Sequence, residues 1–349
     1  MTGRIYLDHA ATTPLLPAAR AAMGQGFAAW ANPSSPHAEG RAAKALLEDA
    51  RARLAAALGW GGAVLFTAGA SEALAIALTR NKANAVLASA TEHDAVLRHV
   101  PPDRRLPVDI DGIVQLPERI TPGTLFAIQQ VNSETGVIQP LDDLAERIHA
   151  AGSWLLADCS QGAGKLPLPQ GADLLVISAH KLGGPIGVGA LLVRDLALLD
   201  PVGGQEQGYR AGTEAMPLAA GFAAAVEEGT QWLEKAVRWR SHLDAAISAA
   251  GGDIVASASR RIATIGSYRM PGMSAQAQLI RFDMAGIAVS AGSACSSGTL
   301  KASGVLTAMG WPEEHAAEVV RVSLGHNTQE SDIQAFLAQW LALYSGSRT

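Results

Sequence analysis

A lysine at the end of an apolar run is the first residue whose type and position could do chemistry. Residues 172–193 read ADLLVISAHKLGGPIGVGALLV, so Lys181 follows a predicted buried strand and precedes a glycine-rich turn. Burial disfavours the charged ammonium form, which lowers the pKa of the amine and makes it a usable nucleophile. A solvated lysine at a strand end is the simpler alternative, and Lys181 alone does not decide between them.

Three further polar groups follow other predicted strands. Asp158 ends the run SWLLAD, Ser71 lies in the helix start AGASE after strand LFT, and His93 begins a helix after strand AVLAS. The carboxyl ends of parallel strands meet at one edge of an open α/β sheet, where ligands bind. There the acid could keep a pyridinium nitrogen protonated, and the helix start could bind a phosphate. A plain helix cap is the alternative for Ser71, and an exposed cap position is the alternative for His93.

Together these groups are the parts that pyridoxal phosphate requires. The cofactor needs a lysine for its Schiff base, an acid behind its ring nitrogen and a phosphate site, and the imidazole of His93 could stack on its ring. The ring accepts electrons only while its nitrogen stays protonated, which gives Asp158 a purpose. The conjunction at one sheet edge therefore predicts a pyridoxal-phosphate site, although no single member would.

Other ligand motifs fit less well. The segment GAGK at 162–165 is similar to a phosphate-binding P-loop, but the first glycine of that motif would fall on Cys159, and Leu166 replaces its final Ser or Thr. The glycines of 183–189 lack the GxGxxG spacing and lead into a strand. The nine histidines show no HExxH or comparable spacing, so no metal site is predicted.

A second reactive group is Cys295, which lies in the run SAGSACSSGT at 290–299. These small residues cannot pack a core, so the thiol should be exposed and mobile, and suited to attack a bound substrate. Cys159, after an apolar strand, is expected to be a buried structural residue. Arg321 lies in the apolar run VVRVSLG and needs a partner if it is buried; a substrate carboxylate and an internal salt bridge both fit.

The elements that position these groups are short apolar runs that alternate with longer alanine-rich stretches of helical period, which predicts an α/β fold. The expected strands are Ala63–Thr67, Ala85–Ser89, Thr124–Gln129, Ser153–Ala157, Leu174–Ser178 and Ala190–Val193. The expected helices between them are Ser35–Leu58, Ser71–Thr79, Thr91–His99 and Leu141–Ala151.

A long helical stretch, Met216–Ala250, reads as one helix or two and marks a domain junction. After it the pattern changes to a strand, a helix around Ala275–Met284, a second strand, a Gly/Ser loop and another helix, which predicts a smaller α+β unit. We therefore expect a large domain over residues 15–235, and a small domain formed by 1–14 and 236–349 that carries the cysteine loop.

The composition excludes several classes of protein. With 349 residues, 48% of them hydrophobic and 17% charged, the chain is too apolar to be mainly disordered. Its net charge of −5 without a basic tail argues against a nucleic-acid partner. Two distant cysteines build no disulfide framework, so we expect a reducing cytoplasm. No apolar signal core or bilayer-length segment is apparent, and we expect no membrane role.

Motifs along almost the whole chain resemble those of the cysteine desulfurases, pyridoxal-phosphate enzymes of the class V aminotransferase family, in their nitrogenase-type subgroup. They occur in the family's order. They are YLDHAATTP (6–14), NPSSPH (32–37), TAGASE (67–72), TEHDAV (91–96), VNSETG (131–136), ADCSQGAGK (157–165), SAHK (178–181), GGQEQGYRAGT (203–213), SAGSACSSG (290–298) and RVSLG (321–325).

The resemblance implies a fold and a set of site residues. The fold is the aspartate aminotransferase-like fold of type I pyridoxal-phosphate enzymes, with a mostly parallel seven-stranded sheet and a small α+β domain. Lys181 would form the Schiff base, Cys295 would carry the persulfide, and His93 would stack on the ring and relay protons. The other cofactor contacts would be Ala70, Ser71, Ser133, Asp158, Gln161, Ser178, His180 and, from the second subunit of a homodimer, Thr213. Asn132 and Arg321 would bind the substrate.

The implied reaction converts L-cysteine to L-alanine and leaves the sulfur on Cys295, from which it passes to an iron–sulfur scaffold or a tRNA-thiolation protein. Two residues depart from the family pattern: Ser133 and Ala75 stand where the family commonly has Asn. A selenocysteine lyase or another class V aminotransferase or lyase is the alternative enzyme. A cofactor-binding protein without activity and a redox sensor built on Cys295 are the alternatives of other classes.

Overall fold

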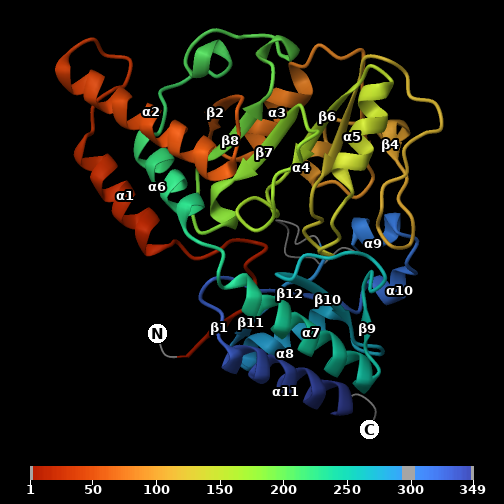
Figure 1. Ribbon diagram of the computed structural model, residues 1–349. Coiled ribbons are helices and arrows are strands. Elements are labelled where there is room, and N and C mark those ends of the chain that lie inside the picture. Colours follow the sequence, from red (N-terminus) through yellow and green to blue (C-terminus); the bar gives the residue numbers. More distant parts are fainter. Residues whose placement is uncertain (1–2, 293–302, 347–349) are drawn as a thin grey trace.

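The computed structural model describes residues 3–292 and 303–346, and it consists of two bodies of unequal size (Figure 1). The larger body contains a seven-stranded sheet, and the smaller body contains a three-stranded sheet (Figure 1). The chain passes between them in the N-terminal segment before α1 (Pro17–Ala28) and again between α6 (Met216–Glu227) and α7 (Leu233–Ala250). The expected α/β fold is confirmed.

The large sheet has the strand order β2-β8-β7-β6-β5-β3-β4. Its strands are β2 (Ala63–Thr67), β3 (Ala85–Ser89), β4 (Arg105–Leu106), β5 (Thr124–Gln129), β6 (Trp154–Asp158), β7 (Leu174–Ser178) and β8 (Gly189–Val193). β8 is antiparallel to both β2 and β7, and the other neighbours are parallel. The carboxyl ends of β2, β3, β5, β6 and β7 therefore lie at one edge, where open α/β sheets bind ligands.

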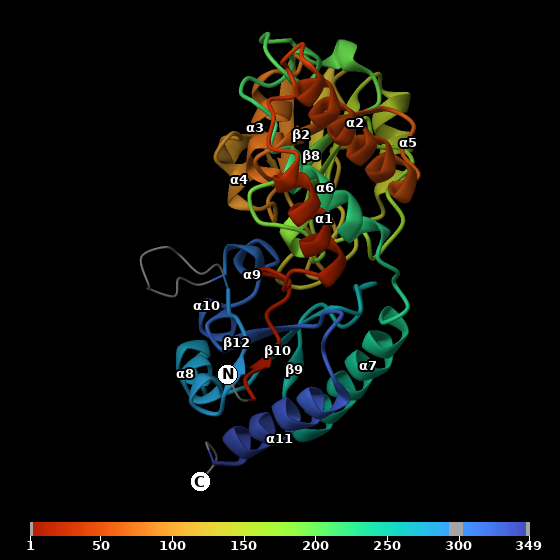
Figure 2. The ribbon, with the colours of Figure 1, turned by 90° about the vertical axis from the view of Figure 1, so that its left-hand side faces the viewer.

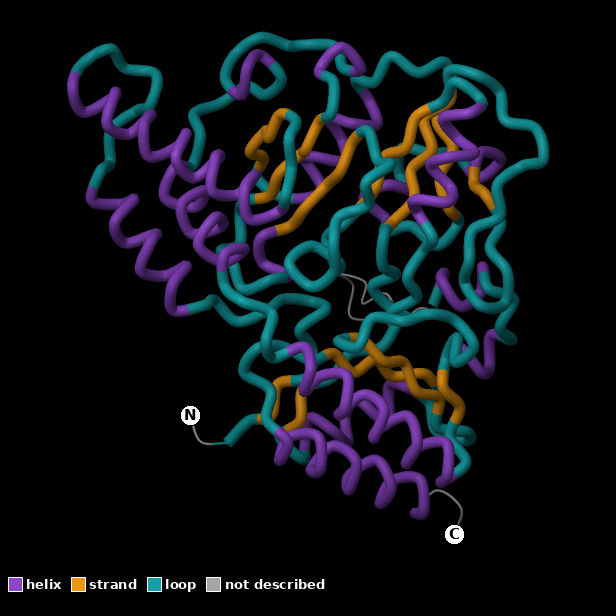
Figure 3. Tube along the Cα trace, viewed as in Figure 1, coloured by secondary structure: helices purple, strands orange, loops and turns teal. Residues whose placement is uncertain are grey.

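Helices cover both faces of this sheet (Figure 3), which explains why β5, β7 and β8 are buried at every residue. Besides α1 and α6, they are α2 (Ala38–Leu58), α3 (Ala70–Thr79), α4 (Asp94–Leu97) and α5 (Leu141–Ala150). The cores on the two sides are distinct: Leu47, Ile148 and Phe222 pack from α2, α5 and α6, whereas Leu74 and Val96 pack from α3 and α4. The apolar strands are thus sealed between two helical layers.

One expected helix, Thr91–His99, is too long, because α4 covers only Asp94–Leu97. The reason is local hydrogen bonding. The side chain of His93 caps the helix by accepting from the N–H of Ala95, and the hydroxyl of Thr91 is bonded to that of Ser89. Residues before Asp94 are therefore held in a turn rather than in a helical conformation.

The smaller body is built on the antiparallel sheet β12-β10-β9. Its elements, besides α7, are β9 (Asp253–Ile254), β10 (Ile265–Arg269), α8 (Ala275–Met284), β11 (Ile287–Ala288), α9 (Gly304–Ala308), α10 (Glu313–Ala316), β12 (Val319–Ser323) and α11 (Glu330–Gly346). α7 and α11 lie side by side on its outer side (Figure 2). The N-terminal strand β1 (Ile5–Tyr6) pairs with β11, which supports our proposal that residues 1–14 belong to the small domain.

The long stretch Met216–Ala250 forms two helices, α6 and α7, with a break at 228–232. The break lies between the two bodies, where a domain junction was expected. Among the described residues, none of the helices combines the length and the apolar character needed to cross a bilayer.

Candidate active site

Lys181 lies directly beyond the buried strand β7, in the 3-10 turn Ala179–Lys181. Its Nζ donates hydrogen bonds to the carbonyl oxygens of Ala10 (2.6 Å) and Ala11 (2.9 Å). Burial and the charge of Arg321 lower the pKa of this amine to about 8, against the opposing charges of Asp158 and Asp8. The amine is therefore close to the state that a nucleophile requires near neutral pH.

Asp158 ends β6, the strand that pairs with β7, and faces Val176 in the register. Its Oδ1 accepts a hydrogen bond from the N–H of Ser160 (2.9 Å). Its negative charge also acts on Lys181, whose pKa it raises, and on the buried Glu92, whose pKa burial already holds well above the usual range. Burial therefore favours the uncharged form of Glu92 beside this strand end.

A helix N-terminus lies at the same edge, after β2. Helix α3 begins at Ala70, and its N-cap, Gly69, provides no side-chain cap, so Ser71 is the second helical residue and the plain-cap alternative for it is wrong. Gly189 of β8 lets the turn approach the sheet, because a Cβ there would lie 2.7 Å from the carbonyl carbon of Gly69 and 2.9 Å from the nitrogen of Ala70. The first N–H groups of α3, with the exposed Ser71 beside them, could therefore hold an anion, and we call this helix start the anion cradle.

Two further predicted phosphate contacts follow β7. Ser178 is the last residue of that strand and is buried. His180 lies within the 3-10 turn, and its Nδ1 is 3.1 Å from the hydroxyl oxygen of Thr12. Burial and the charge of Lys181 lower the pKa of His180 to about 4, so its imidazole is neutral at physiological pH.

His93 is the N-cap of α4, and its ring is exposed at the strand-end edge. Its Nδ1 accepts the hydrogen bond from the N–H of Ala95 (3.1 Å), which leaves Nε2 as the other ring nitrogen for a ligand. Gln161 is buried and donates from Nε2 to the carbonyl oxygen of Ala10 (2.9 Å). Its Oε1 is buried and has no partner among the described residues, so it is a polar atom that a ligand could satisfy.

Arg321 reaches this edge from the smaller body, on β12. Its Nη2 donates to Oδ1 of Asp8 (2.7 Å), so the expected alternative of an internal salt bridge is confirmed. Its Nη1 donates to the carbonyl oxygen of Ser133 (2.9 Å), while Nε is buried without a partner among the described residues. A guanidinium group has five N–H donors, so these two bonds leave donors for a carboxylate.

Asn132 and Ser133 lie in the turn after β5. The side-chain oxygen of Asn132 accepts from the N–H groups of Glu134 (2.9 Å) and Thr135 (2.8 Å), and its amide donates to the carbonyl oxygen of Thr91 (3.1 Å). Asn132 therefore holds the shape of the turn that presents the Ser133 carbonyl to Arg321. Asparagine followed by a turn is a signal for this role.

The remaining predicted residues are Cys295, Thr213 and Ala70. Cys295 falls outside the described residues. Thr213 is exposed at the end of a loop over 203–213, and no hydrogen bond within the described part of the chain links it to the strand-end groups. Ala70 contributes through its backbone only, as the first residue of α3. Cys159, by contrast, is fully buried, as expected for a structural cysteine.

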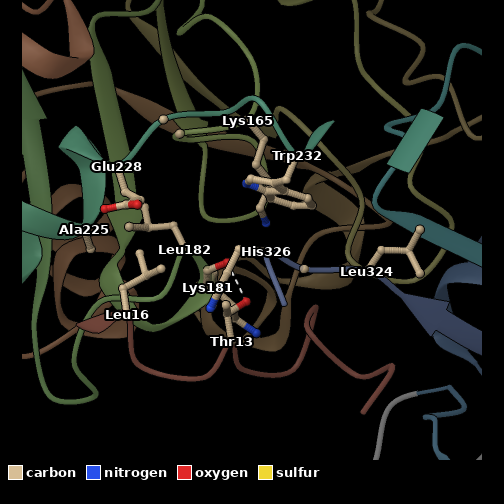
Figure 4. Close-up of a pocket in the computed structure, with 13 residues that line it drawn as sticks. Thr13, Leu16, Lys165, Lys181, Leu182, Ala225, Glu228, Trp232, Leu324 and His326 are labelled. Carbon is tan, nitrogen blue, oxygen red and sulfur yellow. Dashed lines mark hydrogen bonds between the residues drawn. The ribbon is translucent and has the colours of Figure 1, made fainter. Parts of the chain in front are cut away.

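Sequence reasoning missed several charged and aromatic neighbours of Lys181. A pocket behind the lysine, at the junction of the two bodies, is lined by Lys165, Lys181, Glu228, Trp232 and His326, among others (Figure 4). Burial and the charge of Lys181 lower the pKa of Lys165 to about 7. In the sequence, Lys165 stood only at the end of the motif ADCSQGAGK, within the segment GAGK, and neither carried a signal for a second buried amine.

Asp8 and His9 were also missed, although both stand in the motif LDHAATTP. His9 is buried against Tyr6 and His326, and burial with the neighbouring His326 and Lys165 lowers its pKa to about 3. Both nitrogens of its ring lack a partner among the described residues. The turn that follows Asp8 touches Lys181, Gln161 and His180 through backbone or hydroxyl groups, so the N-terminal segment is part of the site.

The sheet order, the lysine beyond β7, the acid at the end of β6 and the helix start after β2 together define a type I pyridoxal-phosphate fold. The chain belongs to the class-V aminotransferase family, whose model matches residues 5–336. Enzymes of this family depend on pyridoxal phosphate.

The relatives within that family narrow the assignment. The chain is 33% identical to "cysteine desulfurase IscS 1" of Archaeoglobus fulgidus, over 95% of this chain and 94% of the relative. It is 34% identical to a cysteine desulfurase of Cereibacter sphaeroides, over 96% and 94%. A solved NifS-like protein from Rickettsia africae superimposes with a TM-score of 0.89 at 30% identity, covering 98% of this chain and 100% of that one. A structure described as SspA in complex with cysteine has a TM-score of 0.79 at 29% identity, over 92% and 98%.

Proposed function

We propose that this chain is a cysteine desulfurase: with pyridoxal phosphate bound, it removes the sulfur of L-cysteine, releases L-alanine and holds the sulfur on Cys295 as a persulfide. The observation that carries the proposal is the meeting of Lys181, Asp158 and Arg321 at one edge between the two bodies, with the pKa of the Lys181 amine lowered to about 8. The names of its relatives support the reaction.

The residues present fit pyridoxal phosphate. The cradle at the start of α3, with Ser71, Ser178 and His180, suits the phosphate, and the unsatisfied Oε1 of Gln161 suits a hydroxyl donor. Lys181 would hold the aldehyde and Asp158 the ring nitrogen. When bound, the cofactor supplies an electron sink for the bonds at the substrate Cα.

The chain's own residues would then act on the substrate as follows. Arg321 binds the carboxylate of L-cysteine, and Lys181 and His93 move protons at the substrate Cα and Cβ. The thiolate of Cys295 attacks the substrate sulfur, a sulfur–sulfur bond forms, and the carbon–sulfur bond breaks. The carbon takes a proton, so one cysteine and one enzyme thiol yield one alanine and one enzyme persulfide, with no external oxidant.

The partners follow from the same proposal. Thr213, exposed on its loop, would reach the phosphate of a second copy in a homodimer. The persulfide sulfur would pass to an acceptor protein of iron–sulfur assembly or tRNA thiolation. The reaction requires Cys295 as a free thiol, which a reducing compartment maintains, in keeping with a cytoplasmic enzyme.

The test is a direct assay with L-cysteine and a reductant. We expect L-alanine and sulfide in equal amounts, without a 2-oxo acid, and we expect the variant Cys295→Ser to release no alanine although the bound cofactor keeps its absorbance. A requirement for a 2-oxo acid would identify a transaminase instead. Turnover of selenocysteine alone would identify a selenocysteine lyase, and a yellow protein that turns over neither would be a binding protein.

A further inference from the structure

Asp8 lies where the N-terminal segment meets β12. Its backbone forms a parallel bridge with Ser323, and the N–H of Ser323 donates to the carbonyl oxygen of Leu7 (2.8 Å). The hydroxyl of Ser323 in turn accepts from the N–H of Ala10 (2.8 Å). Ser323 thus fixes the main chain on both sides of Asp8, and it lies two positions from Arg321 along the same strand.

The side chain of Asp8 uses this fixed position to hold Arg321. The distance from Nη2 of Arg321 to Oδ1 of Asp8 is 2.7 Å, and the side chains of Arg321 and Asp8 are 10% and 21% exposed. Ser133 accepts from the other terminal nitrogen, Nη1, at 2.9 Å. Two anchors on two different nitrogens define the plane of a guanidinium group, because the group is rigid and planar.

The remaining donors of Arg321 then have a fixed direction. Each terminal nitrogen keeps one N–H, and a carboxylate can accept from two parallel N–H groups at once. Without Asp8, the single bond from Nη1 to the Ser133 carbonyl would let the group turn about it. The orientation that a carboxylate meets would be lost, whereas the positive charge would remain.

We propose that Asp8 is a positioning residue for substrate binding: its carboxylate aims the guanidinium of Arg321 at the carboxylate of the amino-acid substrate. The inference rests on the proposed function, since it requires an amino acid at this edge. Asp8 acts through Arg321 and does not touch the substrate. A salt bridge that only ties the N-terminal segment to β12 is the competing explanation, and it predicts no preference for ligands with a carboxylate.

Substitution can separate the effect of the Asp8 charge from the effect of its hydrogen-bond acceptor. Asp8→Asn removes the charge but keeps an oxygen that accepts from Nη2, whereas Asp8→Ala removes both. Either change removes the negative charge that raises the pKa of Lys181, so an effect on that amine appears in both variants. An effect through the orientation of Arg321 appears mainly in the alanine variant.

The experiment is an absorbance titration of the cofactor-loaded protein with L-alanine and with L-alaninamide, which lacks the carboxylate. We expect Asp8→Ala to weaken L-alanine binding by about tenfold or more and to change alaninamide binding by less than about twofold. Asp8→Asn should stay within about threefold of the wild type for both ligands. In an Arg321→Lys background, Asp8→Ala should cause no further loss.

Two controls keep the result specific. Asp283 forms another Asp–Arg pair in the smaller body, with Arg4, and this pair is exposed. Asp283→Ala should therefore leave both titrations unchanged. Thermal denaturation of the cofactor-free variants shows whether the N-terminal segment still folds. Equal losses for L-alanine and alaninamide, or no loss in Asp8→Ala, would overturn the inference. If wild-type protein binds no L-alanine and releases none from cysteine, the proposed function itself has failed.

Discussion

Glu206 and Arg51 form a two-pronged ion pair inside the larger body. The Nη1 and Nη2 atoms of Arg51 lie 2.7 and 3.1 Å from the two carboxylate oxygens, and the N–H of Phe66 donates to the same carboxylate at 2.9 Å. Glu206 itself has a left-handed backbone, with φ of 50°, and its side chain is fully buried. The ion pair therefore joins the loop at 203–213 to helix α2, and the Phe66 hydrogen bond joins it to strand β2, which leads into the anion cradle.

Breaking this pair should destabilise the protein strongly. Arg51→Met leaves the charge of Glu206 buried without its partner, and we expect a loss of about 3–5 kcal/mol in the free energy of unfolding. Urea denaturation followed by circular dichroism measures it. Arg53→Met is the matched control, because Arg53 makes a similar pair with Glu227 at the surface, where both side chains are more than a third exposed. That variant should lose less than about 1 kcal/mol. Equal losses in both variants would contradict the conclusion that the buried Arg51–Glu206 pair stabilises the fold more than a surface pair.

A methyl group at Gly189 should damage the anion cradle. Its Cβ would lie 2.7 to 2.9 Å from backbone atoms of Gly69, Ile177 and Ala70, and none of these can move without shifting the strand or the start of α3. We expect Gly189→Ala to lose about 1–3 kcal/mol of stability and to bind pyridoxal phosphate more weakly. Gly61→Ala is the control, since a Cβ there meets no atom within 4 Å. Unchanged cofactor affinity, measured by quenching of tryptophan fluorescence, would place the phosphate elsewhere.

The sequence predicted six of the seven strands of the larger body to within one residue at each end, because buried parallel strands are continuous apolar runs with turn residues on both sides. It missed the two-residue strand β4. It also placed Lys181 and Asp158 at the edge of the sheet where the carboxyl ends of the parallel strands lie, because the direction of the strands alone decides which edge a following residue reaches. The extent of the helix after His93 was wrong, since a side-chain cap decided where it begins. Propensity does not contain that information.

Contacts between distant segments could not be predicted in the same way. Asp8 and Arg321 are 313 positions apart, and their pairing depends on how the N-terminal segment crosses β12. Lys165 is a neighbour of Lys181 only because the turn after β6 packs beside the turn after β7. The first contact is set by the way the two bodies meet and the second by the packing of two turns, and a single sequence carries no periodic signal for either.

Lys165 should make the cofactor-free protein less stable at neutral pH than at alkaline pH. Its pKa is about 7 in the folded chain, below the 10.5 of a free lysine, so between these values the unfolded chain binds more protons and the free energy of unfolding rises with pH. Below pH 7 both states are protonated and the full cost of burying the ammonium is present. Lys165→Met should therefore be more stable than the wild type at pH 6, and this advantage should shrink by pH 10. Urea denaturation across that range measures the difference.

The control for this titration is Lys82→Met, which removes an amine from the surface, where it lies near Asp200. Groups distant from Lys165 titrate alike in wild type and variants, so they cancel in each difference, whereas His9 and Lys181 are coupled to Lys165 and add to its effect. An advantage of Lys165→Met that is constant from pH 6 to pH 10 would mean that the amine escapes into solvent. That result would also mean that the pocket behind Lys181 does not hold the Lys165 ammonium group.

Lys181 and Lys165 line one pocket, so a test must show which amine holds the cofactor. Borohydride reduction of the loaded protein should fix pyridoxal phosphate to Lys181, whose amine has a pKa of about 8 and lies beyond β7 on the ligand edge. Lys181→Ala should abolish this fixation and slow alanine formation by about 10²–10⁴-fold, the usual worth of a proton-transfer group. Lys165→Met should still be fixed by borohydride at residue 181, as identified by peptide mass spectrometry. Label on Lys165 in the wild type would show that Lys165 and not Lys181 holds the cofactor, and the reaction would then take place in the pocket at Lys165.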